Sequence, residues 1–289
     1  MLPNFLILGA AKAGTSSLCE YLKTHPQIYM SPIKEPNFFA LDGTEPQFPS
    51  EDMRRSLDGT ITHDLASYER LFERARDETA RGEGSSWYLH SRKAPERIQH
   101  YIPRTRMIVI LRNPVERAYS AYRMHRRLGT EQAPTFAQAL AEQERRRNTW
   151  DWGTEYLEPG YYHRHLSRYF ERFRREQIRV YLHEDYSADP AGIVRDVLQF
   201  LEVDPSFVPP NLAVRYNTAE NSPRPAGALA GILRRLTGRG AALASAPAAT
   251  PSRASDVAEE IRAELIGLYR EDIGKLQSLI ARDLRSWLV

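Results

Sequence analysis

Short apolar runs alternate with helical patterns along most of the chain. Buried parallel strands have continuous apolar runs, whereas amphipathic helices repeat their apolar positions every three to four residues. The alternation predicts an α/β fold in which a mostly parallel central sheet is covered by helices on both faces. The predicted strands are Phe5–Leu8, Ile28–Met30, a segment that ends before Gly84, Met107–Leu111 and Ile178–Leu182.

The first helix is predicted to follow the first strand directly. It should run from Thr15 to about His25, because Pro26 cannot continue it. Its apolar stripe, which we expect to face the core, consists of Leu18, Tyr21 and Leu22.

A second helix is predicted after the Met107–Leu111 strand. Asn113 suits the N-cap, Pro114 the first helical position and Glu116 a capping box. Gly129 is a natural stop. Ser120 lies off the apolar stripe of this helix, so we expect it to be available to a ligand.

The C-terminal part differs in composition from the rest. Residues 238–254 are low in complexity, and we expect a mobile loop there. An amphipathic helix is predicted from about Asp256 to Leu288. We therefore expect one domain over residues 1–289, with this helix packed on it. The apolar positions of the helix are Ile261, Leu265, Leu268, Ile273, Leu276, Ile280, Leu284 and Trp287.

The stretch FLILGAAKAGTSS carries the first candidate chemistry. An apolar strand leads through a glycine- and alanine-rich turn into a helix start, an arrangement that binds phosphate or sulfate on backbone N–H groups. Gly9 and Gly14 have the spacing of a Walker A loop, but Thr15 stands where that motif has its lysine. Lys12 lies inside the loop instead.

A second anion site is predicted at the end of the MIVIL strand. An ATPase of this class places a Mg²⁺-binding aspartate at such a position, whereas this chain has Arg112. Arg112 and Ser120 together offer a guanidinium fork and a hydroxyl to a phosphate group. The sequence thus predicts two anion sites without a metal ligand between them.

Composition changes this picture little. The 40 Lys and Arg against 37 Asp and Glu are too balanced to predict nucleic-acid binding. The excess of arginine over lysine suits phosphate or sulfate recognition, and GC-rich codon bias explains it as well. The single cysteine, Cys19, excludes an internal disulfide and is expected in the core. No run is long enough for a membrane span and no basic leader is visible, so we expect a cytoplasmic protein. The oligomeric state is left open.

Several motifs in order resemble the sulfotransferases that use 3′-phosphoadenosine 5′-phosphosulfate (PAPS), in particular a bacterial type of the heparan-sulfate branch. The resemblance implies a P-loop nucleotide-kinase-like three-layer sandwich with a central parallel sheet. It also implies transfer of a sulfuryl group from PAPS, with 3′,5′-adenosine bisphosphate (PAP) as product and no metal. The motifs are FLILGAAKAGTSSLCEYLKTHPQI, SPIKEPNFF, LRNPVERAYSAY, EPGYYHRHLSRYFERF, IRVYLHEDYSADP and LIGLYREDIGKLQSLIARDLRSWL.

The resemblance assigns roles to individual residues. Glu35 is implied as the general base and Lys12 as the cation at the oxygen that bridges phosphate and sulfuryl group. Without the resemblance, a surface ion pair with Lys34 would explain Glu35 equally well, and His125 and His90 are the alternative bases. The implied donor-binding residues are Lys12, Ala13, Gly14, Thr15, Ser16, Ser17, Arg112, Ser120 and Arg224.

The acceptor side is less well defined. Heparan enzymes often carry a lysine where this chain has Gly84, which argues against a polyanionic acceptor. Trp87 and Tyr88 suit either stacking on the acceptor or core packing, and the same holds for Trp150, Trp152 and Tyr156. His163 and His165 point apart on a helix, so we expect no metal pair there.

Two other functions compete with sulfuryl transfer. An ATP- and Mg²⁺-dependent small-molecule kinase predicts a lysine at position 15 and an aspartate after the second core strand, and the chain has neither. A non-catalytic nucleotide-binding module would keep the loops without a working base. For a transferase, we expect a hydroxyl rather than an amine as acceptor, on a carbohydrate, a lipid or a secondary metabolite.

Overall fold

The computed structural model describes residues 1–41, 61–146, 155–214, 216 and 257–289. Five parallel strands form one sheet in the order β2-β3-β1-β4-β5. Four strands lie at predicted apolar runs, and the fifth, ARGEG, lies at the predicted segment near Gly84 but is not apolar and includes that glycine. All of β1 and the residues of β4 from Met107 to Leu111 are buried and are apolar or glycine, as expected for strands that are covered on both faces. The strands are β1 (Phe5–Gly9), β2 (Ile28–Met30), β3 (Ala80–Gly84), β4 (Arg106–Leu111) and β5 (Ile178–Leu182).

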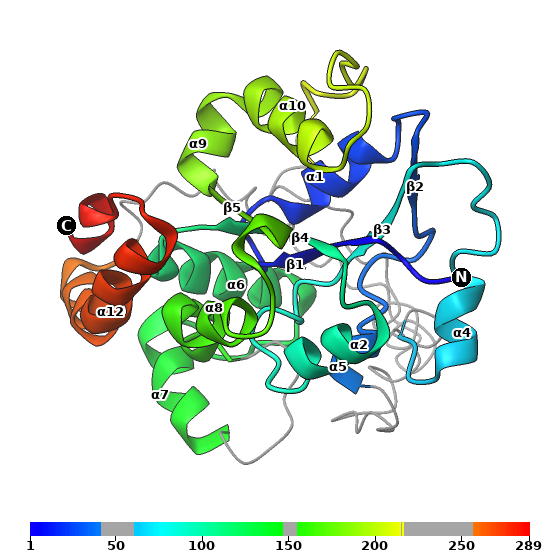
Figure 1. Ribbon diagram of the computed structural model, residues 1–289. Coiled ribbons are helices and arrows are strands. Elements are labelled where there is room, and N and C mark those ends of the chain that lie inside the picture. Colours follow the sequence, from blue (N-terminus) through cyan, green and yellow to red (C-terminus); the bar gives the residue numbers. More distant parts are fainter. Residues whose placement is uncertain (42–60, 147–154, 215, 217–256) are drawn as a thin grey trace, which may run out of the picture.

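Helices cover both faces of this sheet, so the predicted α/β sandwich of three layers is confirmed. Figure 1 shows α1 (Thr15–Leu22), α9 (His183–Ala188) and α10 (Pro190–Phe200) on one face. The other face carries α2 (Phe38–Leu41), α5 (Ala94–Tyr101), α6 (Pro114–Leu128) and α8 (Tyr162–Phe170), with α7 (Phe136–Arg146) further out. The helix α4 (Leu65–Arg70) lies near the N-terminus.

The predicted bounds are confirmed for α6, which follows β4, but not for the end of α1, which follows β1. Asn113 caps α6, because its side-chain oxygen accepts from the N–H groups of Val115 and Glu116. The predicted stop at Gly129 is also confirmed, with φ of 73°. The predicted continuation of the first helix to His25 is wrong, since α1 ends at Leu22 and a turn follows.

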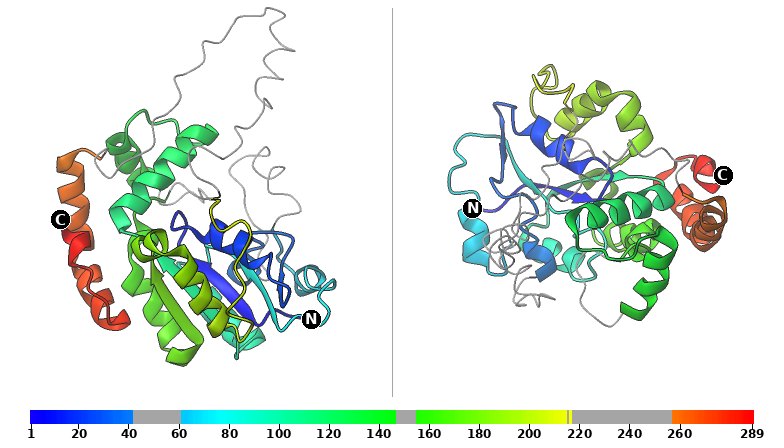
Figure 2. Two further views of the ribbon diagram at one scale, coloured as in Figure 1. Left: turned by 90° about the horizontal axis from the view of Figure 1, so that it is seen from above. Right: turned by 180° about the vertical axis from the view of Figure 1, so that it is seen from behind.

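The C-terminal helix is shorter than predicted. The helix α12 spans Glu259–Ile280, and Ala281 leaves it in the left-handed conformation (φ 53°) before a short 3₁₀ turn, η4 (Arg285–Leu288). Leu268 is 47% exposed, so its predicted burial is wrong, whereas Leu265 and Trp287 are buried. Figure 2 shows α12 along one flank, beside α8 and away from the N-terminus. The predicted mobile loop 238–254 lies outside the described residues.

The topology places the candidate chemistry at one edge of the sheet. From β1 the chain crosses to β2 on one side, whereas β4 and β5 lie on the other side of β1. Ligands of open α/β sheets bind where the connections diverge in this way, at the carboxyl ends of the strands. Here that place lies between β1 and β4. In the described part of the chain, no helix has the length and apolar character of a membrane span.

Candidate active site

The two predicted anion sites meet at the carboxyl ends of β1 and β4. The backbone N–H of Ala10 donates to the carbonyl of Ile110 (2.7 Å). Two residues further along both segments, Arg112 donates from Nη1 to the carbonyl oxygen of Lys12 (3.2 Å). The guanidinium that follows β4 is therefore held against the loop that follows β1.

The start of α1 has the features of the predicted anion site. Gly14 occupies the N-cap in the left-handed region (φ 102°), no side chain caps the helix, and its first turn has no acidic residue. A Cβ on Gly14 would lie 3.0 Å from the ring of Tyr186, so the close approach of α9 also requires glycine. Thr15 and Ser17 are buried and Ser16 is half-buried. The helix thus presents backbone N–H groups and the positive end of its dipole.

Lys12 lies within a group of cations. Burial, and then the charges of Arg127, Arg112, Lys34 and Arg117, lower the pKa of Lys12 to about 8. Its Nζ lies 3.4 Å from the sulfur of Met124 on α6. A bound polyanion would relieve the repulsion between these side chains, so the residues present fit a ligand with several negative charges.

Arg112 is fixed from both sides. Its carbonyl accepts from the hydroxyl of the buried Tyr162 (2.8 Å), and its guanidinium lies 3.9 Å from the carboxylate of Glu116. Glu116 in turn accepts from Arg262 of α12 at 2.6 Å. Ser120 is half-buried on α6, the helix of Glu116, and lies off its apolar stripe as predicted.

Glu35 reaches the same edge from the loop after β2. Its carboxylate accepts from the N–H and the hydroxyl of Ser86 (2.8 and 3.0 Å) and from Nζ of Lys34 (2.9 Å). The ion pair with Lys34 therefore exists, but it is one of three contacts. A Cβ on Gly9 would lie 3.0 Å from the Ser86 carbonyl oxygen, so Ser86 brings Glu35 to the end of β1.

The alternative bases have packing roles. His125 lies at the C-terminal end of α6, where its Nδ1 pairs with the hydroxyl of Thr130 (2.9 Å). Burial lowers the pKa of His90 to about 3, and its ring centroid is 6.1 Å from that of His165. Among the described residues, no group of three His, Cys, Asp or Glu side chains is arranged to hold a metal ion.

The aromatic residues divide between core and edge. Tyr88 and Tyr156 are fully buried, and the Tyr156 hydroxyl donates to Glu131 (2.9 Å), so both belong to the core. Trp87 is half-buried beside His90. Trp150 and Trp152 lie outside the described residues.

Arg224 also lies outside the described residues. Of the stretch 215–224 that contains it, the structure describes Tyr216, whose N–H donates to the hydroxyl of Ser17 (3.0 Å). This stretch therefore begins beside the start of α1.

Gly84 is explained by its neighbour on α1. A Cβ at position 84 would lie 2.6 Å from the sulfur of the buried Cys19. The Cys19 side chain fills the space that a side chain at position 84 would need. This packing explains why the chain has glycine where heparan enzymes often have a lysine. Cys19 itself lies in the core, as predicted.

At this edge, sequence reasoning missed His183, and it gave Glu83 no role of its own within the stretch Glu83–Tyr88, which resembles the acceptor-lining segment of the family. His183 follows β5 directly, and its Nδ1 pairs with the carbonyl of Ala13 (3.0 Å), so it supports the loop before α1. Its place right after a parallel strand is a signal that could have found it. Glu83 in β3 is completely buried, and burial raises its pKa to about 7. The sequence around Glu83, next to a glycine in a short strand, gives no sign that this side chain is buried.

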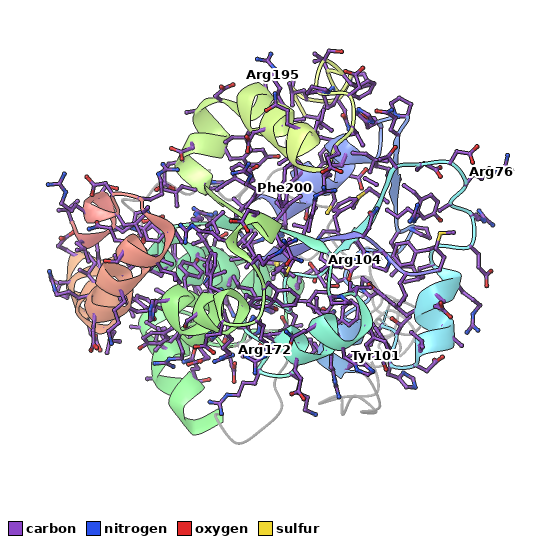
Figure 3. The ribbon with its side chains drawn as sticks, in the orientation of Figure 1. Arg76, Tyr101, Arg104, Arg172, Arg195 and Phe200 are labelled. Atoms are coloured by element: carbon purple, nitrogen blue, oxygen red, sulfur yellow. The ribbon has the colours of Figure 1, made fainter. Side chains whose placement is uncertain are left out.

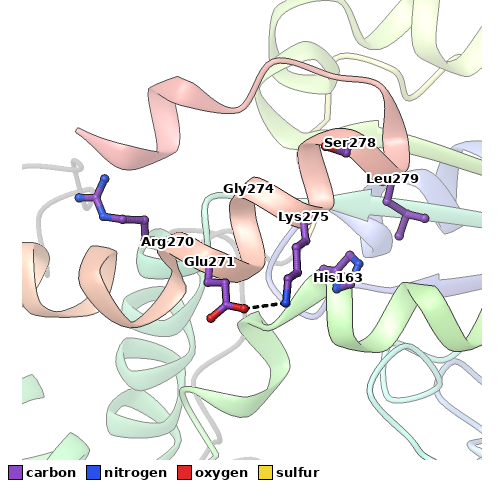
Figure 4. A pocket seen from close by; sticks show the side chains of 7 residues that line it. All are labelled: His163, Arg270, Glu271, Gly274, Lys275, Ser278 and Leu279. Atoms are coloured by element: carbon purple, nitrogen blue, oxygen red, sulfur yellow. Dashed lines mark hydrogen bonds and ion pairs between the residues drawn. The ribbon is translucent and has the colours of Figure 1, made fainter.

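Other charged features lie away from this edge. Arg76, Arg104, Arg172 and Arg195 are exposed on the surface (Figure 3), so at these positions arginine is a solvated side chain. Figure 4 shows a pocket between α8 and α12, where Lys275 pairs with Glu271 (2.6 Å). None of its lining residues comes from the loops that follow the strands. They are His163, Arg270, Glu271, Gly274, Lys275, Ser278 and Leu279.

Comparison with known proteins identifies the family. Heparan sulfate glucosamine 3-O-sulfotransferase 3B1 of Homo sapiens is 30% identical over 200 residues, which cover 69% of this chain and 46% of that protein. Bifunctional heparan sulfate N-deacetylase/N-sulfotransferase 3 of Mus musculus is 29% identical over 219 residues, covering 71% of this chain and 23% of that protein. The chain thus matches less than half of the length of these two relatives.

A solved structure agrees over nearly the whole chain. The crystal structure of a sulfotransferase from Alicyclobacillus acidocaldarius is 33% identical, covers 99% of both chains and has a TM-score of 0.79. The predicted fold class is confirmed by this likeness. The family model of the sulfotransferase domain matches residues 2–219. The chain therefore belongs to the sulfotransferase domain family, as its motifs indicated.

Proposed function

We propose that the protein transfers a sulfuryl group from PAPS to an acceptor hydroxyl. The observation that carries this proposal is the contact of Arg112 with the Lys12 carbonyl. This contact joins two predicted anion sites, each with a cationic side chain, at one edge of the sheet. PAPS has a phosphosulfate at one end of its ribose and a phosphate at the other. A pair of adjacent anion sites matches that distribution of charge.

In this proposal, each group of the donor has its own partners. Lys12, Ala13 and the N–H groups from Gly14 to Ser17 hold the 5′-phosphosulfate, with the hydroxyls of Thr15, Ser16 and Ser17 beside them. Arg112 and Ser120 hold the 3′-phosphate. Arg224 remains a predicted further contact to the nucleotide.

The reaction is an in-line displacement at sulfur. The acceptor oxygen forms a bond to sulfur while the bond from sulfur to the 5′-phosphate oxygen breaks, and that electron pair leaves with PAP. Glu35 takes the proton of the acceptor hydroxyl. Lys12 stabilises the negative charge that develops on the leaving oxygen. No step needs a metal ion or a redox cofactor.

A carbohydrate hydroxyl is the acceptor that we favour. The relative at 30% identity is named as a glucosamine 3-O-sulfotransferase, and oxygen acceptors need a base such as Glu35. Cys19 fills the space beside Gly84, so the lysine of heparan enzymes has no equivalent there. We therefore propose an acceptor with less negative charge than heparan sulfate; a lipid or secondary metabolite hydroxyl is the alternative.

The variant Glu35→Gln tests the proposed role of the base. We expect PAP formation from PAPS, in a screen of hydroxyl acceptors, to fall roughly a hundredfold or more, because proton transfer contributes about that much. The affinity for PAP should not change, since Glu35 contacts the acceptor. The exposed Glu171→Gln is the matched control. Unchanged turnover in Glu35→Gln would remove Glu35 from the mechanism, and no turnover in any variant would favour a binding module.

A further inference from the structure

Glu83 is a completely buried carboxylate beside the proposed base. Its Oε2 accepts from the hydroxyl of Ser85 (2.8 Å) and its Oε1 from the hydroxyl of Tyr68 on α4 (3.1 Å). The hydroxyl of Tyr88 is a third hydrogen-bond partner. A buried carboxylate is stable only when its oxygens are satisfied in this way. These partners hold Glu83 in one position.

The bond from Ser85 to Glu83 determines how the Ser85 hydroxyl is oriented. A serine hydroxyl has one proton and two lone pairs. Because the proton is donated to Glu83, the oxygen is left to accept from the N–H of Asn37 (3.1 Å). Glu83 thereby controls a contact to the loop that carries Glu35.

That loop needs external support. Glu35 and Asn37 both have left-handed backbone conformations (φ 63° and 56°). Asparagine tolerates this conformation, but for Glu35 it is unfavourable. The N–H of Glu35 donates to the carbonyl of Gly84 (3.0 Å), and the Asn37 side chain donates to the carbonyl of Glu35 (2.8 Å). The bond from Asn37 to Ser85 adds to these contacts, as do the bonds from Ser86 to the Glu35 carboxylate and from the N–H of Thr62 to the carbonyl of Pro36 (2.9 Å).

We propose that Glu83 is a positioning residue of the transfer site, which acts through Ser85 to hold the Glu35 loop at the end of β1. This inference rests on the proposed role of Glu35. It distinguishes Glu83 from a second base, although its raised pKa and its place beside the site would suit that role too.

The neutral form of Glu83 keeps the same contact. An amide or a protonated carboxyl has one acceptor and one donor side. The hydroxyl of Tyr68 can turn from donor to acceptor, so the acceptor side still faces Ser85. The charged or titratable groups nearest to Glu83 are Glu35, Lys34, Cys19, Tyr68 and Tyr88. Positioning should therefore persist when Glu83 takes up a proton.

Four variants separate positioning from proton transfer. Ser85→Ala and Glu83→Leu remove the contact, and Glu83→Gln keeps it without a titratable group. The matched control is Tyr181→Phe in β5, which removes a hydroxyl that donates to the carboxylate of Asp196 (2.6 Å). We follow PAP release from PAPS with water as acceptor between pH 6 and 8. We expect Ser85→Ala and Glu83→Leu to lower the rate roughly tenfold or more, because a misplaced catalytic group costs about that much. The double variant should lose no more than either single one.

Glu83→Gln should stay within about threefold of the wild-type rate with the same pH profile, as should Tyr181→Phe. Calorimetry should find the PAP affinity of Ser85→Ala unchanged. If Glu83→Gln lost its activity, or lost a decline of the rate toward pH 6 that the wild type shows, the proposal would be overturned in favour of proton transfer. Wild-type activity in Ser85→Ala, or an equal loss of PAP affinity, would overturn it too.

Hydrogen–deuterium exchange tests the proposal without the reaction. Ser85→Ala should speed exchange in the peptide that contains Asn37 and leave the β1 peptide unchanged; unchanged exchange at Asn37 contradicts positioning. If the wild-type protein bound no PAP and released none from PAPS, the proposed function would fail, and the exchange result would still judge the loop contact separately.

Discussion

Arg112 donates from Nη1 to the backbone carbonyl of Lys12 at 3.2 Å, although the two residues are 100 positions apart in the chain. This bond ties the end of β4 to the loop after β1. It places a guanidinium at the position where an ATPase of similar topology needs a carboxylate for its metal. The two residues therefore form the structural basis of the proposed donor specificity.

Arg112→Ala should weaken PAP binding much more than AMP binding. A hydrogen bond to a charged group contributes about 1.5–3 kcal/mol, so the dissociation constant of PAP should rise roughly ten- to hundredfold. AMP has no 3′-phosphate, so its affinity should change little. Titration calorimetry with both nucleotides measures the difference, and the exposed Arg76→Ala is the control. An equal loss for AMP and PAP would show that Arg112 does not read the 3′-phosphate.

PAP affinity should fall as the pH rises through about 8. The pKa of Lys12 is lowered to about 8 by burial and by neighbouring cations, so the free protein loses this charge at mildly alkaline pH. Binding an anion favours the protonated form, and binding therefore takes up a proton above that pH. Calorimetry between pH 7 and 9.5 should show the decline in the wild type and a flatter profile in Lys12→Ala. The same slope in both proteins would contradict this role.

The same shift affects stability in the opposite direction. The pKa of Lys12 is lower in the folded state than its ordinary value of 10.5, so the folded protein binds fewer protons between about pH 8 and 10.5. The contribution of Lys12 to the free energy of unfolding should therefore increase with pH through that window. Urea unfolding of wild type and Lys12→Ala at pH 7.5 and 9.5 checks the sign. A decreasing contribution of Lys12 would refute it.

Arg262→Ala should lower both stability and PAP affinity. Its pair with Glu116 is mostly buried, with both side chains 14% exposed. Removal leaves a buried carboxylate without this partner, which costs about 1–3 kcal/mol. That carboxylate then competes with the 3′-phosphate for Arg112. We expect a lower urea midpoint and a PAP affinity reduced by a few fold.

The pair of Arg282 with Asp185 is the matched control for this prediction. Its distance is also 2.6 Å, but its side chains are 42% and 39% exposed. Arg282→Ala should therefore cost about 0–1 kcal/mol. Equal effects of the two substitutions on stability and on PAP affinity would show that the contact between α12 and α6 has no special role.

Gly84→Ala should destabilise the protein, and Cys19→Ala should compensate. The added Cβ would lie 2.6 Å from the Cys19 sulfur, and overpacking a core costs about 1–3 kcal/mol. Shortening residue 19 makes room for it. Urea unfolding of the two single variants and the double variant measures the coupling. Additive effects of the two substitutions would mean that the side chains do not compete for the same space.

Local patterns predicted most of the strands and the turn between β1 and α1, because each depends on neighbouring residues. The run from Phe5 to Leu8 and the turn after it could be predicted without knowledge of the rest of the fold. The cap at Asn113 was similarly predictable. Arg112 was identified because it follows a strand directly, and the family resemblance supplied Glu35.

Contacts between distant segments could not be predicted in this way. The partners of Glu35 on Ser86 are 51 positions away, and the burial of Glu83 depends on Tyr68 and on the fold around it. Ala281 ends the C-terminal helix although alanine favours helices, so tertiary packing overrides propensity there.

The most direct test of the account is calorimetric binding of PAP compared with ATP, with and without Mg²⁺. We expect PAP to bind at least tenfold more tightly than ATP, because Arg112 adds a charged contact to the 3′-phosphate. We also expect that Mg²⁺ does not strengthen binding. Binding of Mg²⁺-ATP in preference to PAP would contradict it.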